Sequence, residues 1–138
     1  MSRPLKRLIL GGALVASLAA FTGLVVAQSG LTRTPVIKAD VSVPGREAVV
    51  AKVEIAPGGE AGWHTHPGDE ISYVAEGDLM LSIAGQAPRK VKAGEGFVVP
   101  AGTPHNAKNE GSSATKVVGV YVVEKGKPLA SPASAPMH

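Results

Sequence analysis

The chain has 138 residues, a formal net charge of +3 and no cysteine. That length accommodates one domain with a substantial apolar core, and the lack of cysteine excludes thiolate catalysis, thiolate metal sites and disulfide cross-links. The basic excess lies at the N-terminus, because residues 28–138 carry eleven Lys and Arg against eleven Asp and Glu. A chain balanced in this way has no concentrated positive surface for binding nucleic acid.

Residues 1–27 have the layout of a signal peptide. Three basic residues lie among the first seven, an apolar run follows over 8–26, and small residues end at Ala27. This order is typical of export signals. We therefore expect cleavage after Ala27 and a periplasmic or secreted protein that no longer contacts the membrane. The alternative is an uncleaved membrane anchor over 8–26, because about 20 apolar residues span a bilayer.

Residues 28–44 form a lead-in segment, in which 35–37 is predicted to be a short strand. The sequence that follows consists of short apolar runs separated by Gly and Pro, a pattern typical of an all-β sandwich or barrel. Over 48–55 the apolar side chains alternate with polar ones such as Lys52. That period of two indicates a half-buried strand.

Five more strands are predicted further along the chain, at 71–74, 79–83, 89–92, 96–99 and 116–123. The strand at 116–123 is apolar on both faces, so we expect it to be covered on both sides. No helical period appears after residue 27. The sequence therefore predicts one all-β domain over 45–126, followed by a flexible tail over 127–138 that is rich in Pro, Ala and Ser.

The histidines of the domain gather around one stretch of sequence. His64 and His66 lie two residues apart, so a strand directs both imidazoles to the same side, and Glu70 follows after a predicted bend. Neutral imidazoles and a carboxylate are natural ligands for a divalent first-row transition metal. The chain has four histidines, and His138 ends the tail. The third imidazole is therefore expected from His105.

The residues around these side chains match two gapped motifs. Residues 58–77 fit G-x5-H-x-H-x3-E-x6-G and residues 94–109 fit G-x5-P-x-G-x2-H-x3-N, with sixteen residues between them. Both motifs, complete and in this order, resemble those of the cupin superfamily. The resemblance implies a single-domain jelly-roll β-barrel, in which Asn109 is a motif position but not a ligand. It also implies one metal ion inside the barrel mouth, bound by His64, His66, Glu70 and His105.

Three imidazoles and one carboxylate leave two open positions on an octahedral metal, and open positions distinguish a reactive site from a structural one. The expected metal is a divalent Fe, Mn, Cu, Ni or Zn ion. Among cupin activities, the sequence favours a dioxygenase-type oxidoreductase acting on a small molecule. A lyase or isomerase is less favoured, because it needs a further acid or base and no histidine or cysteine remains. The open alternative is a non-catalytic cupin that binds a small ligand or the metal itself.

The pocket around such a metal is less well defined by the sequence. If Glu70 faces the metal, strand parity predicts that Ser72 and Val74 point inward and that Tyr73 points outward. A homodimer is also open, with the contact supplied by 116–123 or by the lead-in segment. The candidate substrate-binding residues, for which ordinary core packing is the alternative, are Met80, Phe97 and Tyr121.

Overall fold

The computed structural model describes residues 30–137 of the chain. These residues form ten strands in two five-stranded antiparallel sheets. The first sheet has the order β1 (Leu31–Asp40), β2 (Arg46–Ile55), β9 (Thr115–Glu124), β4 (Gly68–Glu76) and β7 (Gly96–Val99). The second sheet has the order β10 (Ser131–Pro132), β3 (His64–Thr65), β8 (His105–Lys108), β5 (Asp78–Ile83) and β6 (Arg89–Lys92).

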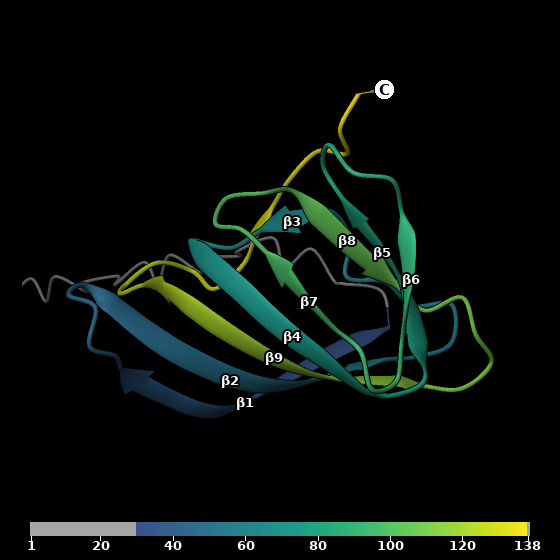
Figure 1. The fold of residues 1–138 in the computed structure, drawn as a ribbon, viewed down its shortest axis with the longest axis horizontal. Helices are drawn as coiled ribbons and strands as arrows, with labels where there is room; N and C mark the ends of the chain where they lie inside the picture. Colours follow the sequence, from purple (N-terminus) through teal and green to yellow (C-terminus); the bar gives the residue numbers. More distant parts are fainter. Residues whose placement is uncertain (1–29, 138) are drawn as a thin grey trace, which may run out of the picture.

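The long strands β1, β2, β9 and β4 curve along one side of the molecule, and β5, β6 and β8 lie across from them (Figure 1). This arrangement confirms the predicted all-β jelly roll. Among residues 30–137 no helix has the length and apolar character needed to cross a membrane. The predicted signal peptide over 1–27 lies outside the described residues.

The space between the two sheets is filled by alternate side chains of the strands. On β2, Ala51 and Ile55 are buried whereas Lys52 is exposed, and β9 follows the same alternation. On β5, Leu79 and Leu81 contribute to the same core. Burial of one face therefore fixes the register of these strands, because a slip by one residue would turn the apolar set toward solvent.

The lead-in segment forms a much longer strand than the sequence predicts. Strand β1 pairs with β2 from Leu31 to Asp40, with a register shift between Pro35 and Ile37. Proline has no N–H to donate, and the edge position of β1 accommodates it there. Most side chains of β1 are exposed, so the apolar alternation that indicates a strand is absent from its sequence.

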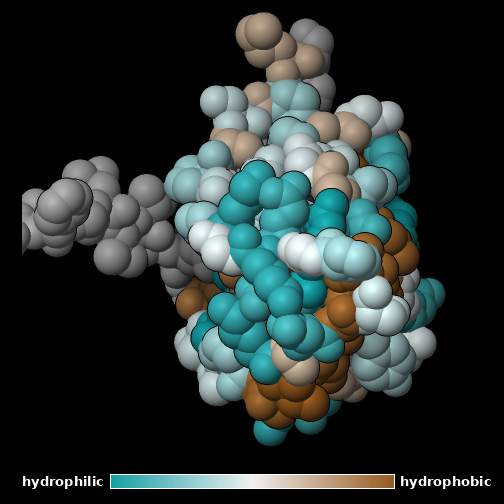
Figure 2. All heavy atoms as spheres, turned by 90° about the vertical axis from the view of Figure 1, so that its left-hand side faces the viewer, coloured by the Kyte–Doolittle hydropathy of each residue, from teal (hydrophilic) through white to brown (hydrophobic). Residues whose placement is uncertain are grey.

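The expectation that strand 116–123 is covered on both sides is wrong. One face of β9 is buried, but Val118 on the other face is 37% exposed. Ile71 and Tyr73 on the neighbouring β4 are exposed on the same sheet. Hydrophobic atoms also reach the surface in the view of Figure 2. Valine is favoured in strands because its β-branched side chain packs well on a pleated surface, so a valine on this face need not be buried.

The tail was expected to be flexible, but its first part is paired with the barrel. Ser131 and Pro132 form β10, which pairs with β3 at Thr65 and His64. The Ala133 N–H then donates to the Trp63 carbonyl at 2.9 Å. The tail thus supplies hydrogen bonds to backbone groups of β3 that would otherwise lie at a sheet edge.

Candidate metal centre

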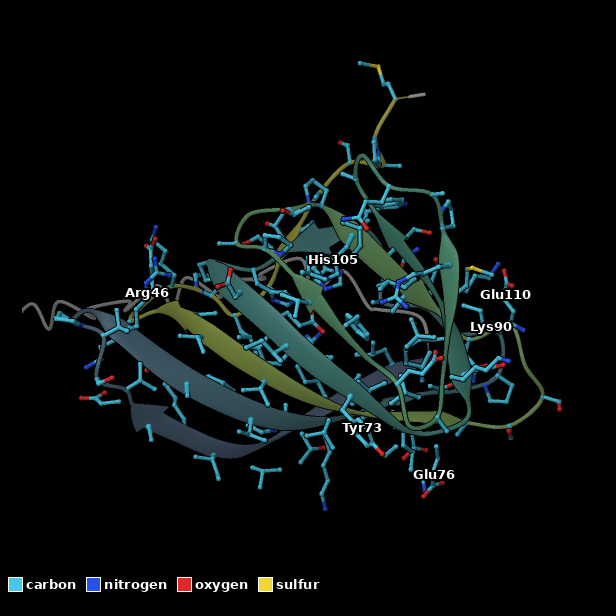
Figure 3. All side chains as sticks on the ribbon, in the orientation of Figure 1. Arg46, Tyr73, Glu76, Lys90, His105 and Glu110 are labelled. Atoms are coloured by element: carbon cyan, nitrogen blue, oxygen red, sulfur yellow. The ribbon has the colours of Figure 1, made fainter. Side chains whose placement is uncertain are left out.

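The four residues predicted as metal ligands are brought together between the two sheets. His64 on β3 is paired with His105 on β8, and Glu70 on β4 is paired with Tyr121 on β9. His66 lies between β3 and β4. All four side chains are buried, and one ligand atom from each lies within 4.8 Å of the others. Figure 3 shows His105 directed into the space between the layers.

Each imidazole is held in one tautomer by a backbone carbonyl. The Nδ1 atoms lie 2.6–2.9 Å from carbonyl oxygens, which only accept hydrogen bonds, so each Nδ1 carries the proton. Each Nε2 is then left with a free lone pair, the form in which imidazole binds metals. The accepting carbonyls are those of Gly62 for His64, Leu129 for His66 and Thr103 for His105.

The free lone pairs converge on the carboxylate. Glu70 Oε2 lies 3.0 Å from Nε2 of both His66 and His105. The Nε2 atom of His66 is buried and has no hydrogen-bond partner among residues 30–137. Acceptor atoms at this separation repel one another unless a proton or a cation lies between them, and leaving a buried polar atom unpaired costs free energy. The donor set therefore fits a metal cation.

The electrostatics of the site favour the same protonation states. Burial, followed by the neighbouring charge of His105, lowers the pKa of His64 to about 4. Burial alone would raise the pKa of Glu70, but the interactions of its carboxylate with His105, His66 and Ser72 outweigh burial and hold that pKa below its ordinary value. At neutral pH the site thus presents a neutral imidazole at His64 together with a carboxylate.

Ser72 fixes the orientation of the Glu70 carboxylate. Its Oγ donates to Glu70 Oε1 at 2.6 Å, which leaves Oε2 facing the imidazoles. The predicted parity of this strand is confirmed, because Ser72 and Val74 are buried and Tyr73 is 51% exposed on the outside of β4 (Figure 3). The hydrogen bond itself was not anticipated, although a hydroxyl two residues after a ligand on the same strand face could have indicated it.

Two further residues near the site, Asn109 and Gly68, stabilise the positions of backbone segments around it. Asn109 is buried, and its amide donates to the carbonyls of Ile55 and Ser113, so it closes a loop as its non-ligand motif position implies. Gly68 stands two residues before Glu70, where a Cβ atom would lie 1.9 Å from the Val122 carbonyl oxygen. Only glycine permits this approach of β4 to β9.

A small cavity with a volume of about 30 Å³ is lined by three of the four candidate ligands, His64, Glu70 and His105. Phe97 and Tyr121, both predicted as pocket residues, contribute to its wall. Met80 does not, because Leu79 and Leu81 take the inward face of β5 and leave Met80 on the other. Arg33 of β1 also lines the cavity, and the sequence pattern gave no indication of it.

Comparison with known proteins assigns this fold and motif set to a family. The family described as "Cupin domain" matches residues 51–123, which is more than half of the chain. The chain belongs to the cupin family. Both predicted motifs of this cupin lie within the matched region, and its four candidate ligands are the motif histidines and glutamate.

Similar proteins include germin-like proteins and oxalate oxidases. Oxalate oxidase 2 of Hordeum vulgare is 34% identical over 109 residues, which cover 67% of this cupin and 49% of that protein. Germin-like protein subfamily 2 member 2 of Arabidopsis thaliana is 36% identical over 87 residues, 57% of this cupin and 40% of that protein. The chain therefore spans about half the length of the curated relatives it matches.

A solved structure shows the same architecture. A recombinant oxalate oxidase in complex with glycolate aligns with a TM-score of 0.61 and 28% identity, over 80% of this cupin and 58% of that chain.

Proposed function

We propose that this cupin is an exported metal-dependent oxidoreductase that uses dioxygen to oxidise a small oxygen-bearing molecule. The observation that carries the proposal is the convergence of three Nε2 lone pairs and one carboxylate oxygen in a buried site. A first-row divalent ion held by four protein donors keeps room for further ligands and supplies Lewis-acid and redox chemistry at that place.

The chain's own residues would hold that ion and shape its surroundings. His64, His66, Glu70 and His105 would provide the ligands, and the carbonyl and hydroxyl partners described above keep them oriented. Affinity of such a donor set generally favours copper, then nickel or zinc, over iron and manganese. If the chain is exported unfolded, the metal supply outside the cytoplasm also decides which ion is bound.

The residues around the cavity favour oxidation over proton-transfer chemistry. Burial and the negative charge of Glu70 raise the pKa of Tyr121 to about 12, so its hydroxyl stays protonated and cannot serve as a general base at neutral pH. The other cavity residues, apart from the candidate ligands and Arg33, are apolar. A lyase or isomerase that abstracts a proton would need a general base, and apart from the candidate ligands this wall does not supply one.

The size of the cavity and the similar proteins both support a small substrate. A volume of about 30 Å³ corresponds to roughly two water molecules, since one needs about 10–15 Å³ on this scale. The names of the oxalate oxidases that resemble this cupin make two-carbon acids the first candidates. Catechols and diketones are larger alternatives that would require the cavity to open.

Oxygen uptake by metal-loaded protein tests the proposal. Protein loaded separately with iron, manganese and copper should consume dioxygen with at least one of oxalate, glycolate, a catechol or a diketone. A Glu70→Gln variant should lose that uptake. If all three loaded forms stay inert while a small molecule still raises the melting temperature, the cupin is instead a non-catalytic binding protein.

A further inference from the structure

A positively charged side chain with an unsatisfied donor lies in the wall of the cavity. Arg33 of β1 lines the cavity together with His64 and Glu70. Its Nε atom is buried and has no hydrogen-bond partner in the described part of the chain. The ion pairs found within residues 30–137 likewise do not include Arg33. A buried guanidinium donor is costly unless something accepts from it.

Tyr121 keeps this guanidinium in place. The Arg33 Cζ atom lies 5.8 Å from the centroid of the Tyr121 ring, within the range of a cation–π contact. The ring in turn lies over Gly119, where a Cβ atom would be 2.6 Å from the Tyr121 hydroxyl oxygen. Since Tyr121 is almost fully buried, the pair is fixed on the cavity wall before any ligand arrives.

We propose that Arg33 anchors the carboxylate of a small organic acid that enters the cavity beside the metal ligands. A planar guanidinium fork matches a carboxylate, and the pairing is strong where water is excluded. Most of the remaining wall is apolar, from residues such as Leu81, Phe97 and Val117, so Arg33 is the group there that selects negative charge. The inference rests on the proposed function and narrows its substrate to carboxylic acids of a few heavy atoms.

Binding of glycolate and of its neutral counterpart glycolamide tests the inference in the metal-loaded protein. The quantity compared between variants is the ratio of glycolate affinity to glycolamide affinity. The contribution of the metal is the same in every variant and therefore cancels in this comparison. In an Arg33→Gln variant we expect glycolate affinity to fall about tenfold or more, as for loss of a charge-assisted hydrogen bond, with glycolamide affinity unchanged. An Arg89→Gln variant is the matched control, because Arg89 is exposed on β6 and outside the cavity wall.

Several outcomes decide the question. An unchanged affinity ratio in Arg33→Gln, or the same loss for both ligands, overturns the inference. Inorganic phosphate binding as tightly as glycolate overturns the assignment to carboxylates. If Arg33→Gln does not fold, Arg33→Lys replaces it, and a severalfold selective loss of glycolate affinity is then expected. If glycolate binding depends on Arg33 but no oxygen is taken up, the inference stands and the oxidoreductase proposal fails. If oxygen is taken up but the ratio of glycolate to glycolamide affinity does not change in Arg33→Gln, the oxidoreductase proposal stands and the inference fails.

Discussion

The tail offers the sharpest test of how the metal site is built. The Leu129 carbonyl accepts a hydrogen bond of 2.6 Å from Nδ1 of His66, across 63 residues of sequence. A chain that ends at Pro128 lacks this acceptor and the pairing of β10 with β3, so the His66 ring is free to turn. A chain that ends at Ala133 keeps both contacts and is the matched control.

The expected loss follows from one buried hydrogen bond. Such a bond contributes about 1–1.5 kcal/mol net, which corresponds to roughly tenfold in an equilibrium constant. Removal of the hydrogen-bond partner of a metal-bound histidine typically costs about 10–100-fold in metal affinity. We therefore expect the chain ending at Pro128 to bind metal about tenfold more weakly than the chain ending at Ala133.

Competition with a chromophoric chelator measures this difference, with zinc or cobalt as the probe metal. Melting curves of both metal-free chains provide the control, because Leu129 also packs against a core cluster that includes Tyr121. Equal metal affinities for the two folded chains would refute the argument that the tail orients His66.

Three further changes test other parts of the site. Ser72→Ala removes the donor to Glu70 Oε1 and should weaken metal binding about tenfold, measured by the same competition; an unchanged affinity would show that the serine does not orient the carboxylate. Because the pKa of folded His64 is lowered to about 4, the unfolded metal-free chain takes up a proton first as pH falls. The free energy of unfolding should therefore drop between pH 6.5 and 4 by up to about 3 kcal/mol, and urea melts that give the same value at both ends would contradict this. Gly68→Ala places a Cβ 1.9 Å from the Val122 carbonyl oxygen and should cost about 3 kcal/mol of stability; a melting temperature within a degree of wild type would show that the strands separate freely.

The parts of the site that could be predicted are those carried by side-chain type and local spacing. His64 and His66 stand two residues apart, so strand parity directs both to the same side. Glu70 and Ser72 are also two residues apart, and both are buried on the same face of β4. Alternation on β2 and β5 likewise marks the core, because burial of one face leaves a period of two in the sequence.

The parts that could not be predicted are carried by the backbone or by contacts far apart in the chain. The contact to His66 is made by the backbone carbonyl of Leu129, so the type of side chain at position 129 does not indicate it. Strand β10 consists of Ser131 and Pro132, which are residue types common in flexible tails. Arg33 lies on an edge strand whose other side chains are mostly exposed, so no periodicity marks it as facing the cavity. The face of β9 with Val118 was wrongly expected to be covered, because β-branched residues also suit an open sheet surface.

Metal analysis of the protein recovered from the compartment where it resides tests the central claim most directly. We predict one equivalent of a first-row transition metal per chain, lost in a His105→Ala variant that still folds. Protein that carries no stoichiometric metal, or a His105→Ala variant that retains it, would contradict a metal centre built from His64, His66, Glu70 and His105.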